Sequence, residues 1–219
     1  MQFNDLAQLP TRQRIKARAE RLFGAWGVFF KGFLKHPVMV GSIVPSSDRT
    51  IDKMLAPVLW NEVKLFVEYG PGVGTFCRAV LDRMPRDATY LAIDTNPDFI
   101  RYLRKSVPDG RFIPVHGSAA DVEAIIAEHG FAHADYILSG LPLSTLPANL
   151  ADDIAQATER ALRPGGAFLI YQFTNFASTL IRPYFERVDR GFEVWNVLPC
   201  RLFWGWKAAP DKPAEYSAR

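Results

Sequence analysis

Short apolar runs alternate with segments of helical periodicity along most of this 219-residue chain. The runs predict buried strands, at residues 63–67, 90–94, 111–115, 134–139 and 167–171. Between them apolar residues recur every three or four positions, which predicts helices, at residues 48–59, 76–84, 96–106, 120–128 and 154–162. Such alternation is typical of a parallel sheet with helices on its faces. Two last runs, 192–197 and 201–206, predict an antiparallel pair that closes the sheet.

A further periodic segment, residues 10–35, has one apolar and aromatic face and one basic face on which Glu20 is the only acid. This pattern is typical of a helix lying in a membrane interface, where each basic residue contributes roughly 1 kcal/mol near an anionic surface. The alternative is a helix that packs on the sheet with its basic side in water, and the two do not exclude one another. The residues expected to touch the membrane are Arg14, Arg18, Leu22, Trp26, Phe29, Phe30 and Phe33.

Composition narrows the function classes only slightly. The chain is 48% apolar with a net charge of +3, too small to imply nucleic acid by itself. Two cysteines make no disulfide framework, so a reducing cytoplasmic compartment is expected. No apolar window of about 18 residues predicts a membrane span, and four scattered histidines predict no metal site. We expect a helix at 1–35, one domain at 36–208 and a disordered tail at 209–219.

The most informative stretch is the glycine turn after the first strand. Glu68, Gly70, Gly72 and Gly74 stand between that strand and the next helix. Glycines let the backbone turn tightly and lie against a ligand. A carboxylate two residues before the first glycine would repel a dinucleotide pyrophosphate and favour a cationic ligand. Asp94 ends the second strand, where an acid is placed to accept hydrogen bonds from ribose hydroxyls. S-adenosylmethionine has a sulfonium, an amino group and a ribose, and no phosphate.

This acid-x-Gly-x-Gly-x-Gly motif resembles the first motif of class I methyltransferases, and Leu-Arg-Pro-Gly-Gly at 162–166 resembles another of their segments. The resemblance implies S-adenosylmethionine as cofactor and a Rossmann-like α/β fold, with a seven-stranded sheet that is parallel except for its last strand. The residues expected around the cofactor are Ile43, Val44, Pro45, Ser46, Glu68, Gly70, Pro71, Gly72, Gly74, Thr75, Asp94, Thr95, Gly117, Ser118, Ala119 and Ser139. Ser118 stands where the family often has an acid that bonds adenine. Ser118, the Ala119 backbone and Asp121 all stay open for that contact.

Two segments give information about the substrate. Residues 41–47, Gly-Ser-Ile-Val-Pro-Ser-Ser, resemble the segment before the glycine motif in peripheral bacterial phospholipid N-methyltransferases; in the related rRNA adenine dimethylases this region closes over the cofactor. After the fourth strand, amine and adenine methyltransferases have Asn-Pro-Pro-Tyr, where this chain has Gly140, Leu141, Pro142 and Leu143. A flipped base would lose a stacking partner worth roughly 1–3 kcal/mol. The Ser-Gly-Leu-Pro-Leu form is that of the phospholipid enzymes.

The resemblance therefore implies stepwise methylation of phosphatidylethanolamine toward phosphatidylcholine at the inner face of the cytoplasmic membrane. The expected partners are anionic phospholipids, phosphatidylethanolamine and its methylated derivatives, and no nucleic acid. Candidate proton acceptors are the Ser139 hydroxyl, the Gly140 and Leu141 carbonyls, Tyr171 and Tyr184, and Arg182 is a candidate for the lipid phosphate. The alternatives are an rRNA adenine dimethylase, a soluble small-amine methyltransferase and a non-catalytic protein that binds the cofactor at a membrane.

Overall fold

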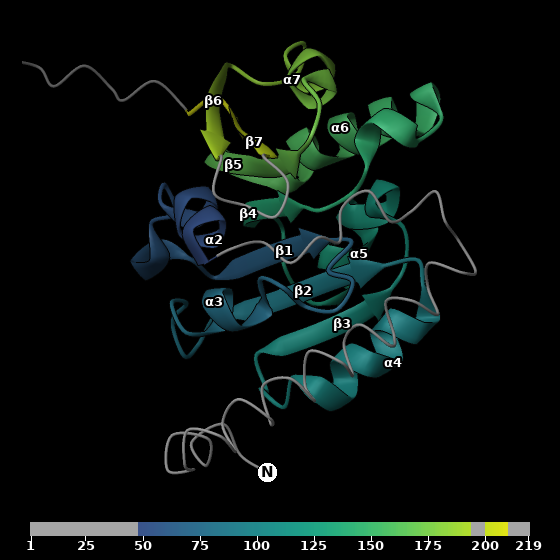
Figure 1. Cartoon of the computed structure of the whole chain (residues 1–219). Helices are drawn as coiled ribbons and strands as arrows, with labels where there is room; N and C mark the ends of the chain where they lie inside the picture. Colours follow the sequence, from purple (N-terminus) through teal and green to yellow (C-terminus); the bar gives the residue numbers. More distant parts are fainter. Residues whose placement is uncertain (1–47, 194–199, 210–219) are drawn as a thin grey trace, which may run out of the picture.

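The protein is described by a computed structural model, which covers residues 48–193 and 200–209. Within these ranges the centre of the molecule is a sheet of seven strands in the order β3-β2-β1-β4-β5-β7-β6 (Figure 1). The strands are β1 Leu65–Tyr69, β2 Thr89–Asp94, β3 Phe112–His116, β4 Ala134–Ser139, β5 Leu162–Gln172, β6 Arg187–Glu193 and β7 Cys200–Trp206. The first five pair in parallel, whereas β7 runs antiparallel to both β5 and β6. The predicted class I methyltransferase fold is confirmed.

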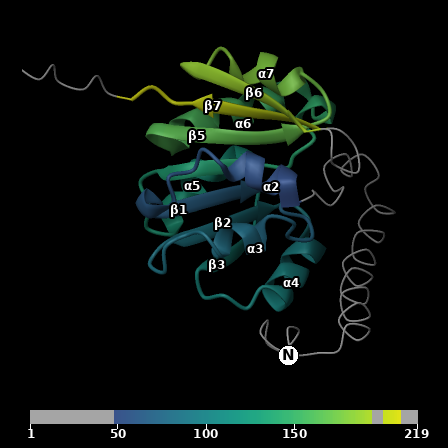
Figure 2. The ribbon, with the colours of Figure 1, turned by 60° about the vertical axis from the view of Figure 1, so that its left-hand side comes forward.

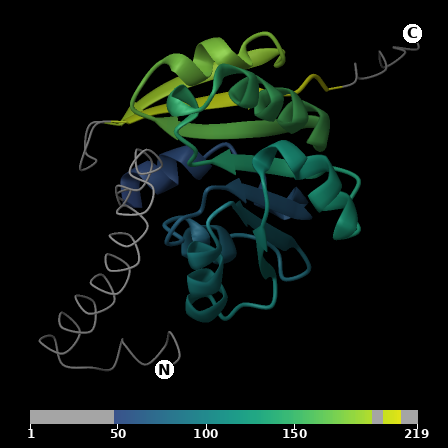
Figure 3. The same cartoon turned by 90° about the vertical axis from the view of Figure 1, so that its right-hand side faces the viewer.

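Helices cover both faces of this sheet. They are α2 Asp48–Leu55, α3 Cys77–Leu81, α4 Pro97–Ser106, α5 Val122–Glu128, α6 Ala148–Ala161 and α7 Phe176–Ile181, with short 3-10 turns η3 Trp60–Glu62, η4 Ala119–Asp121 and η5 Leu143–Thr145. Buried residues of α2, α3 and α4 form one core cluster with the sheet, and α2 and α3 lie in front of it in Figure 2. Residues of α5, α6 and α7 form the second cluster on the opposite face, seen from its side in Figure 3.

Local sequence explains most element boundaries. All residues of β1 and β4 are buried, as expected of strands covered on both faces. At the start of α4, the Asn96 side chain accepts a hydrogen bond from the Asp98 backbone, and Pro97 occupies the first helical position. Helix α2 ends at Leu55, earlier than the predicted residue 59, because Pro57 has no N–H to donate to the helix.

The segment around Pro164 differs from the sequence prediction. The helix predicted at 154–162 begins earlier, at Ala148, and β5 begins directly after it at Leu162, so Gly165 and Gly166 lie inside a strand. Backbone hydrogen bonds to Lys207 hold both glycines beside the end of β7. Gly165 has a φ of 72°, which glycine adopts without strain. Strand β6 likewise begins at Arg187 rather than at 192, since the chain pairs with the full length of β7.

Several sequence predictions fall outside the described residues. These are the membrane helix at 1–35 with its contact residues, the segment containing Ile43, Val44, Pro45 and Ser46, and the tail beyond 209. Among the helices of the described ranges, none is long and apolar enough to cross a membrane.

Candidate active site

The site lies where the strand order reverses. From β1 the chain continues to β2 and β3 on one side, whereas β4 leads to β5 on the other, so the segments after β1 and β4 separate at the carboxyl edge of the sheet (Figure 1). Ligands of open α/β sheets bind in such a crevice. Four polar residues stand at or near the ends of the strands that meet there, Glu68, Asp94, Ser139 and Gln172.

The glycine turn needs its glycines for steric reasons. Gly70, Gly72 and Gly74 have φ values of 63°, 55° and 82°, in the left-handed region. A Cβ on Gly70 would lie 2.9 Å from Leu141 Cδ2, and one on Gly74 would lie 2.9 Å from a Leu103 methyl group. The Gly74 N–H donates to the Pro71 carbonyl (2.8 Å) and closes the turn. The backbone is thus held in a conformation that exposes it to a ligand without side chains in between.

Asp94 links this turn to the end of β2. Its Oδ1 accepts a hydrogen bond from the Asn96 backbone (2.8 Å), and its Oδ2 accepts one from the Gly72 backbone (3.4 Å). Burial raises the pKa of Asp94 to about 6, although these two N–H groups and nearby His116 act to lower it. The carboxylate is therefore fixed in position beside the glycine turn, with acceptor capacity left for two ribose hydroxyls.

Glu68 is buried below the turn. Its Oε2 accepts a short hydrogen bond from the Tyr90 hydroxyl, whereas Oε1 has no hydrogen-bond partner in the part of the chain that the structure describes. Burial raises the pKa of Glu68 to about 7, the Tyr90 hydroxyl lowers it, and Asp94 raises it further. A buried carboxylate oxygen without a partner is rare in proteins, and a cationic ligand group would complete it. Together with Asp94, Glu68 therefore fits S-adenosylmethionine.

The remaining cofactor candidates lie along the same edge. The Gly117 N–H donates to the Asp94 carbonyl (3.1 Å), and Thr95 accepts through its carbonyl from the His116 ring (3.1 Å). Ser118 Oγ accepts from the Ala120 backbone (3.2 Å) and caps the η4 turn. Because this hydroxyl still has its own proton to donate, Ser118 and the neighbouring backbone both stay available to adenine.

The turn after β4 is built around glycine as well. The Gly140 N–H donates to the Tyr69 carbonyl (2.9 Å), and Ser139 Oγ accepts from the Leu141 backbone (3.2 Å). A Cβ on Gly140 would overlap the Tyr171 hydroxyl. The asparagine that adenine methyltransferases have here would therefore displace Tyr171, whose ring packs 4.9 Å from that of Phe76. Burial raises the pKa of Tyr171, so this hydroxyl stays neutral and is a poor general base.

Two candidates for substrate contact lie away from this edge. The Tyr184 hydroxyl donates to Asp152 (2.6 Å) and accepts from Gln156 (3.3 Å), both on the α6 helix. Arg182 is exposed at the end of α7. The preceding residue, Ile181, lies against Gly205, which pairs with Phe168 several residues back from the end of β5. From its position after β5, Arg182 is expected near the site, but the direction of α7 takes it away from the edge, and the sequence does not reveal that direction.

Two residues at the edge were not predicted from the sequence. Gln172 ends β5 and is 7% exposed; its Nε2 donates to the Leu141 carbonyl (2.8 Å), and its Oε1 has no hydrogen-bond partner within the described ranges. Arg201 pairs directly opposite Gln172 and lies over the Phe192 ring, 5.5 Å from its centroid. A polar residue directly after an apolar strand was the available signal for Gln172, as it was for Asp94.

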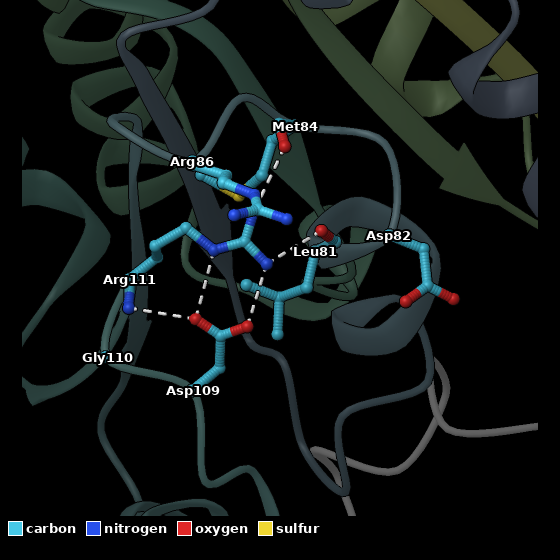
Figure 4. A pocket seen from close by; sticks show the side chains of 7 residues that line it. All are labelled: Leu81, Asp82, Met84, Arg86, Asp109, Gly110 and Arg111. Atoms are coloured by element: carbon cyan, nitrogen blue, oxygen red, sulfur yellow. Dashed lines mark hydrogen bonds and ion pairs between the residues drawn. The ribbon is translucent and has the colours of Figure 1, made fainter. Parts of the chain in front are cut away.

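A surface hollow at the opposite, amino edge of the sheet has a structural role (Figure 4). Arg111 fills it, and its guanidinium binds both carboxylate oxygens of Asp109 and donates to the carbonyls of Leu81 and Met84. With these donors in use, Arg111 holds the end of α3 to the start of β3 and has little left for an anionic ligand.

Comparison with known proteins agrees with this geometry. Residues 66–166 match the family described as a methyltransferase domain. The ornithine lipid N-methyltransferase of Singulisphaera acidiphila is 28% identical over 178 residues, which cover 80% of this chain and 93% of that protein.

Solved structures show the same fold. The N-methyltransferase NodS from Bradyrhizobium japonicum, in complex with S-adenosylhomocysteine, superposes with a TM-score of 0.58 at 15% identity, over 73% of this chain and 86% of that one. An O-methyltransferase family protein from Burkholderia thailandensis gives a TM-score of 0.57 at 17% identity, over 75% of this chain and 57% of that one. With its glycine turn, the fixed carboxylate of Asp94 and the Glu68 oxygen that is unpaired among the described residues, the site of this chain fits S-adenosylmethionine as its cofactor.

Proposed function

We propose that this S-adenosylmethionine-dependent methyltransferase methylates the primary amine of a membrane lipid, phosphatidylethanolamine, stepwise toward phosphatidylcholine. The observation that carries the proposal is the turn after β4. There the Tyr171 hydroxyl fills the space of an asparagine side chain, and Leu143, in place of the stacking tyrosine, is fully buried in the core. A planar base would find neither the asparagine nor the stacking tyrosine that hold it in adenine methyltransferases, whereas a flexible aliphatic amine needs neither.

Two further observations support a lipid. The relative from Singulisphaera acidiphila is named for N-methylation of an ornithine lipid, which shares a primary aliphatic amine with phosphatidylethanolamine. The basic and aromatic faces of residues 10–35 suit attachment to an anionic membrane. The membrane surface on the cytoplasmic side is therefore the proposed location, and the head groups there are the proposed partners.

Catalysis at this site rests mainly on positioning. The cofactor supplies an electrophilic methyl group when it is bound. The amine has to be neutral to attack, although a lysine-like amine has a pKa near 10.4 in water. An apolar surrounding disfavours its charged form. Ser139 and Gln172 both bond the Leu141 backbone, so Ser139 Oγ and Gln172 Oε1 are the oxygens that can accept the amine's protons as hydrogen bonds. The Leu141 carbonyl already accepts from Gln172 Nε2 and from the Leu143 N–H. The chain thus orients the nitrogen and removes it from water without a dedicated base.

The test is methyl transfer from labelled S-adenosylmethionine to vesicles that contain phosphatidylethanolamine, ornithine lipid or phosphatidylcholine alone. Lipids are extracted and separated by head group, with Asp94→Ala as the control that loses the cofactor. We expect label in mono-, di- and trimethylated ethanolamine head groups with the unchanged chain only. Label found only in ornithine lipid would show that the substrate is a lipid amine but is not phosphatidylethanolamine.

A parallel reaction with ribosomal RNA and with soluble amines separates the alternatives. Label in RNA, or in a soluble amine but in no vesicle, would overturn the proposal. Cofactor binding without transfer to any acceptor would instead favour a non-catalytic binding protein.

A further inference from the structure

We propose that Gln172 and Arg201 form a head-group subsite, in which Gln172 takes the substrate amine and Arg201 takes an anionic group a few bonds away. The inference rests on the proposed lipid substrate and specifies how the protein recognises it. The shared ligand chemistry is a primary amine next to an anion, which is the phosphodiester in phosphatidylethanolamine and the carboxylate in an amino-acid lipid.

Strand register places these side chains in one row. Gln172 of β5 pairs with Arg201 of β7, and Arg201 pairs with Phe192 of β6. Directly opposite residues of antiparallel strands project from the same face of the sheet. Adjacent strands lie about 4.8 Å apart. The three residues therefore follow one another across the carboxyl edge, on the face covered by α7, where Phe203 and Ile170 belong to the core.

Gln172 presents a fixed acceptor. Its Nε2 is held by the Leu141 carbonyl at the turn after β4, which sets the orientation of the whole carboxamide. The Oε1 atom is buried and has no hydrogen-bond partner among the described residues. Since a buried carbonyl oxygen is normally paired, a donor from outside the chain is the missing partner. An amine bound for methyl transfer supplies such a donor at the required edge of the sheet.

Arg201 presents a cation that the described part of the chain does not neutralise. Within the described residues its guanidinium makes no hydrogen bond or ion pair and lies over the Phe192 ring. The nearest acid along β6, Glu193, is paired with Lys53 (3.7 Å). A planar guanidinium stacked on an aromatic ring keeps its forked edge for phosphate or carboxylate.

The spacing and the surroundings fit a lipid head group. In ethanolamine phospholipids two carbons and one oxygen separate the nitrogen from the phosphorus, a reach similar to one strand spacing. Exposed aromatic side chains are normally scarce on a surface, yet three occur in these segments. Phe192 belongs to the row, Phe173 directly follows Gln172 and Phe176 begins α7, with exposed fractions of 47%, 39% and 38%. Apolar chains leaving the head group would meet these rings, so the row joins amine, anion and acyl chain in order.

The test compares two amines dispersed in the same neutral micelles, a short-chain phosphatidylethanolamine and a long-chain alkylamine that has no anion. With Arg201→Gln we expect the KM for the phospholipid to rise at least tenfold, and the KM for the alkylamine to stay within twofold. Arg201→Lys should fall in between. The matched control is Arg190→Gln, in which both KM values should stay unchanged. Arg190 is an exposed arginine on the same face of β6 as Phe192, two register pairs further from the edge.

The variant Gln172→Leu tests the role of Gln172 separately from that of Arg201. It should lower kcat at least tenfold on both amines while the affinity for S-adenosylhomocysteine, measured by calorimetry, stays unchanged; unchanged kcat would overturn the role of Gln172. In Arg201→Gln, an equal KM rise on the phospholipid and the alkylamine would overturn the role of Arg201, and so would unchanged KM values for both the phospholipid and ornithine lipid in the same micelles. A KM rise with ornithine lipid but not with phosphatidylethanolamine would support the subsite and identify the anion as a carboxylate.

The subsite can also be tested by binding, without any methyl transfer. Glycerophosphoethanolamine is titrated into the protein saturated with S-adenosylhomocysteine. If no lipid is methylated at all, the proposed function fails, and loss of this binding in Arg201→Gln would still support the subsite. Equal binding by the unchanged chain and by Arg201→Gln would overturn it.

Discussion

The buried carboxylate of Glu68 lowers the stability of the fold at neutral pH. Its pKa rises from 4.5 in the unfolded chain to about 7 in the native protein, chiefly through burial. Between these pH values the native state holds a proton that the unfolded state has lost, so the free energy of unfolding falls as pH rises from about 4.5 to 7. At 1.36 kcal/mol per pKa unit the cost above pH 7 is roughly 3 kcal/mol.

The substitution Glu68→Gln should remove this cost and the cofactor site together. We expect the free energy of unfolding in urea to rise by up to roughly 3 kcal/mol at pH 8, with a gain that shrinks toward zero near pH 4.5. Calorimetry should show no binding of S-adenosylmethionine. A variant that binds the cofactor normally would show that Glu68 is a structural acid.

Cofactor affinity should depend on pH through the same two acids. Glu68 and Asp94 have raised pKa values, of about 7 and about 6. Because the ligand carries positive charge, binding favours the ionised carboxylates, so affinity should be lost as pH falls: about tenfold per unit between 7 and 6, and more steeply below 6. Calorimetry from pH 5.5 to 8 measures this. With Asp94→Asn the steeper part should disappear, and a flat profile in the unchanged chain would contradict both assignments.

At the residue scale, the sequence was sufficient where the chemistry is local. Glu68, Asp94 and the glycines follow their strands directly, so a pattern of strand, acid and glycine locates them without knowledge of the sheet. Gln172 and Arg201 are different, because they become neighbours only through pairing between β5 and β7. Nothing in the 28 residues between them states that register, so the sequence alone points to Arg182, the arginine nearer to β5 in the chain, and not to Arg201.

At the scale of elements, the turn after β4 and the end of β5 depend on one another. Gly140→Ala introduces a methyl group that overlaps the Tyr171 hydroxyl, whereas Gly110 has open space at the same position of its backbone. We expect Gly140→Ala to lower the free energy of unfolding by about 1–3 kcal/mol and methyl transfer at least tenfold. Gly110→Ala is the matched control and should change neither.

The variant Tyr171→Phe tests whether the loss of stability comes from the overlap with the Tyr171 hydroxyl. Removing the hydroxyl relieves the closest overlap and leaves contacts of 3.1 Å with the ring carbon Cζ and the Gly70 carbonyl oxygen. The double variant Gly140→Ala/Tyr171→Phe should therefore be more stable than Gly140→Ala, with a coupling energy of about 1 kcal/mol or more. Urea unfolding of all four proteins gives the cycle. Additive losses would show that the overlap is relieved elsewhere.

A second pair of elements meets at Arg111. This side chain donates to the Leu81 carbonyl at the end of α3 and to the Met84 carbonyl just beyond it, and it is held by Asp109 before β3. Arg111→Ala should leave buried carbonyl groups without a partner and lower the free energy of unfolding by about 2–4 kcal/mol. The affinity for S-adenosylmethionine should not change in the folded protein, since the hollow lies at the far edge of the sheet. Arg111→Lys, with a single point charge in place of a fork, should recover only part of the loss.

At the scale of the whole molecule, alternating apolar periodicity predicted the sheet, its antiparallel end and helices α2 to α6, because helices have to cover both faces of such a sheet. It did not predict α7. The predicted element boundaries were wrong where pairing between distant strands outweighed the local helix and turn signals. Pro164, Gly165 and Gly166 are stop signals for a helix, yet hydrogen bonds to Lys207 draw the two glycines into β5. The direction of α7 likewise depends on packing against β7 and is absent from its own six residues.

The N-terminal segment gives the last prediction, which concerns how the whole chain meets its substrate. Residues 12–21 carry Arg12, Arg14, Lys16, Arg18 and Arg21 on the expected basic side. With roughly 1 kcal/mol for each basic residue near an anionic surface, replacing all five by Gln should weaken sedimentation with vesicles containing anionic lipid by a factor of at least a hundred. Binding of the unchanged chain should weaken as salt is raised, because the attraction is screened over about 10 Å at 0.1 M salt.

The affinity for S-adenosylmethionine should be the same in both proteins, because the cofactor site is built from the glycine turn and Asp94, far along the chain. The decisive comparison is the rate on vesicles against the rate on a micellar short-chain lipid. If the segment acts only by attachment, the five-residue variant should lose activity on anionic vesicles and keep it on neutral micelles. An equal loss on both would mean that residues 12–21 act at the site itself rather than at the membrane.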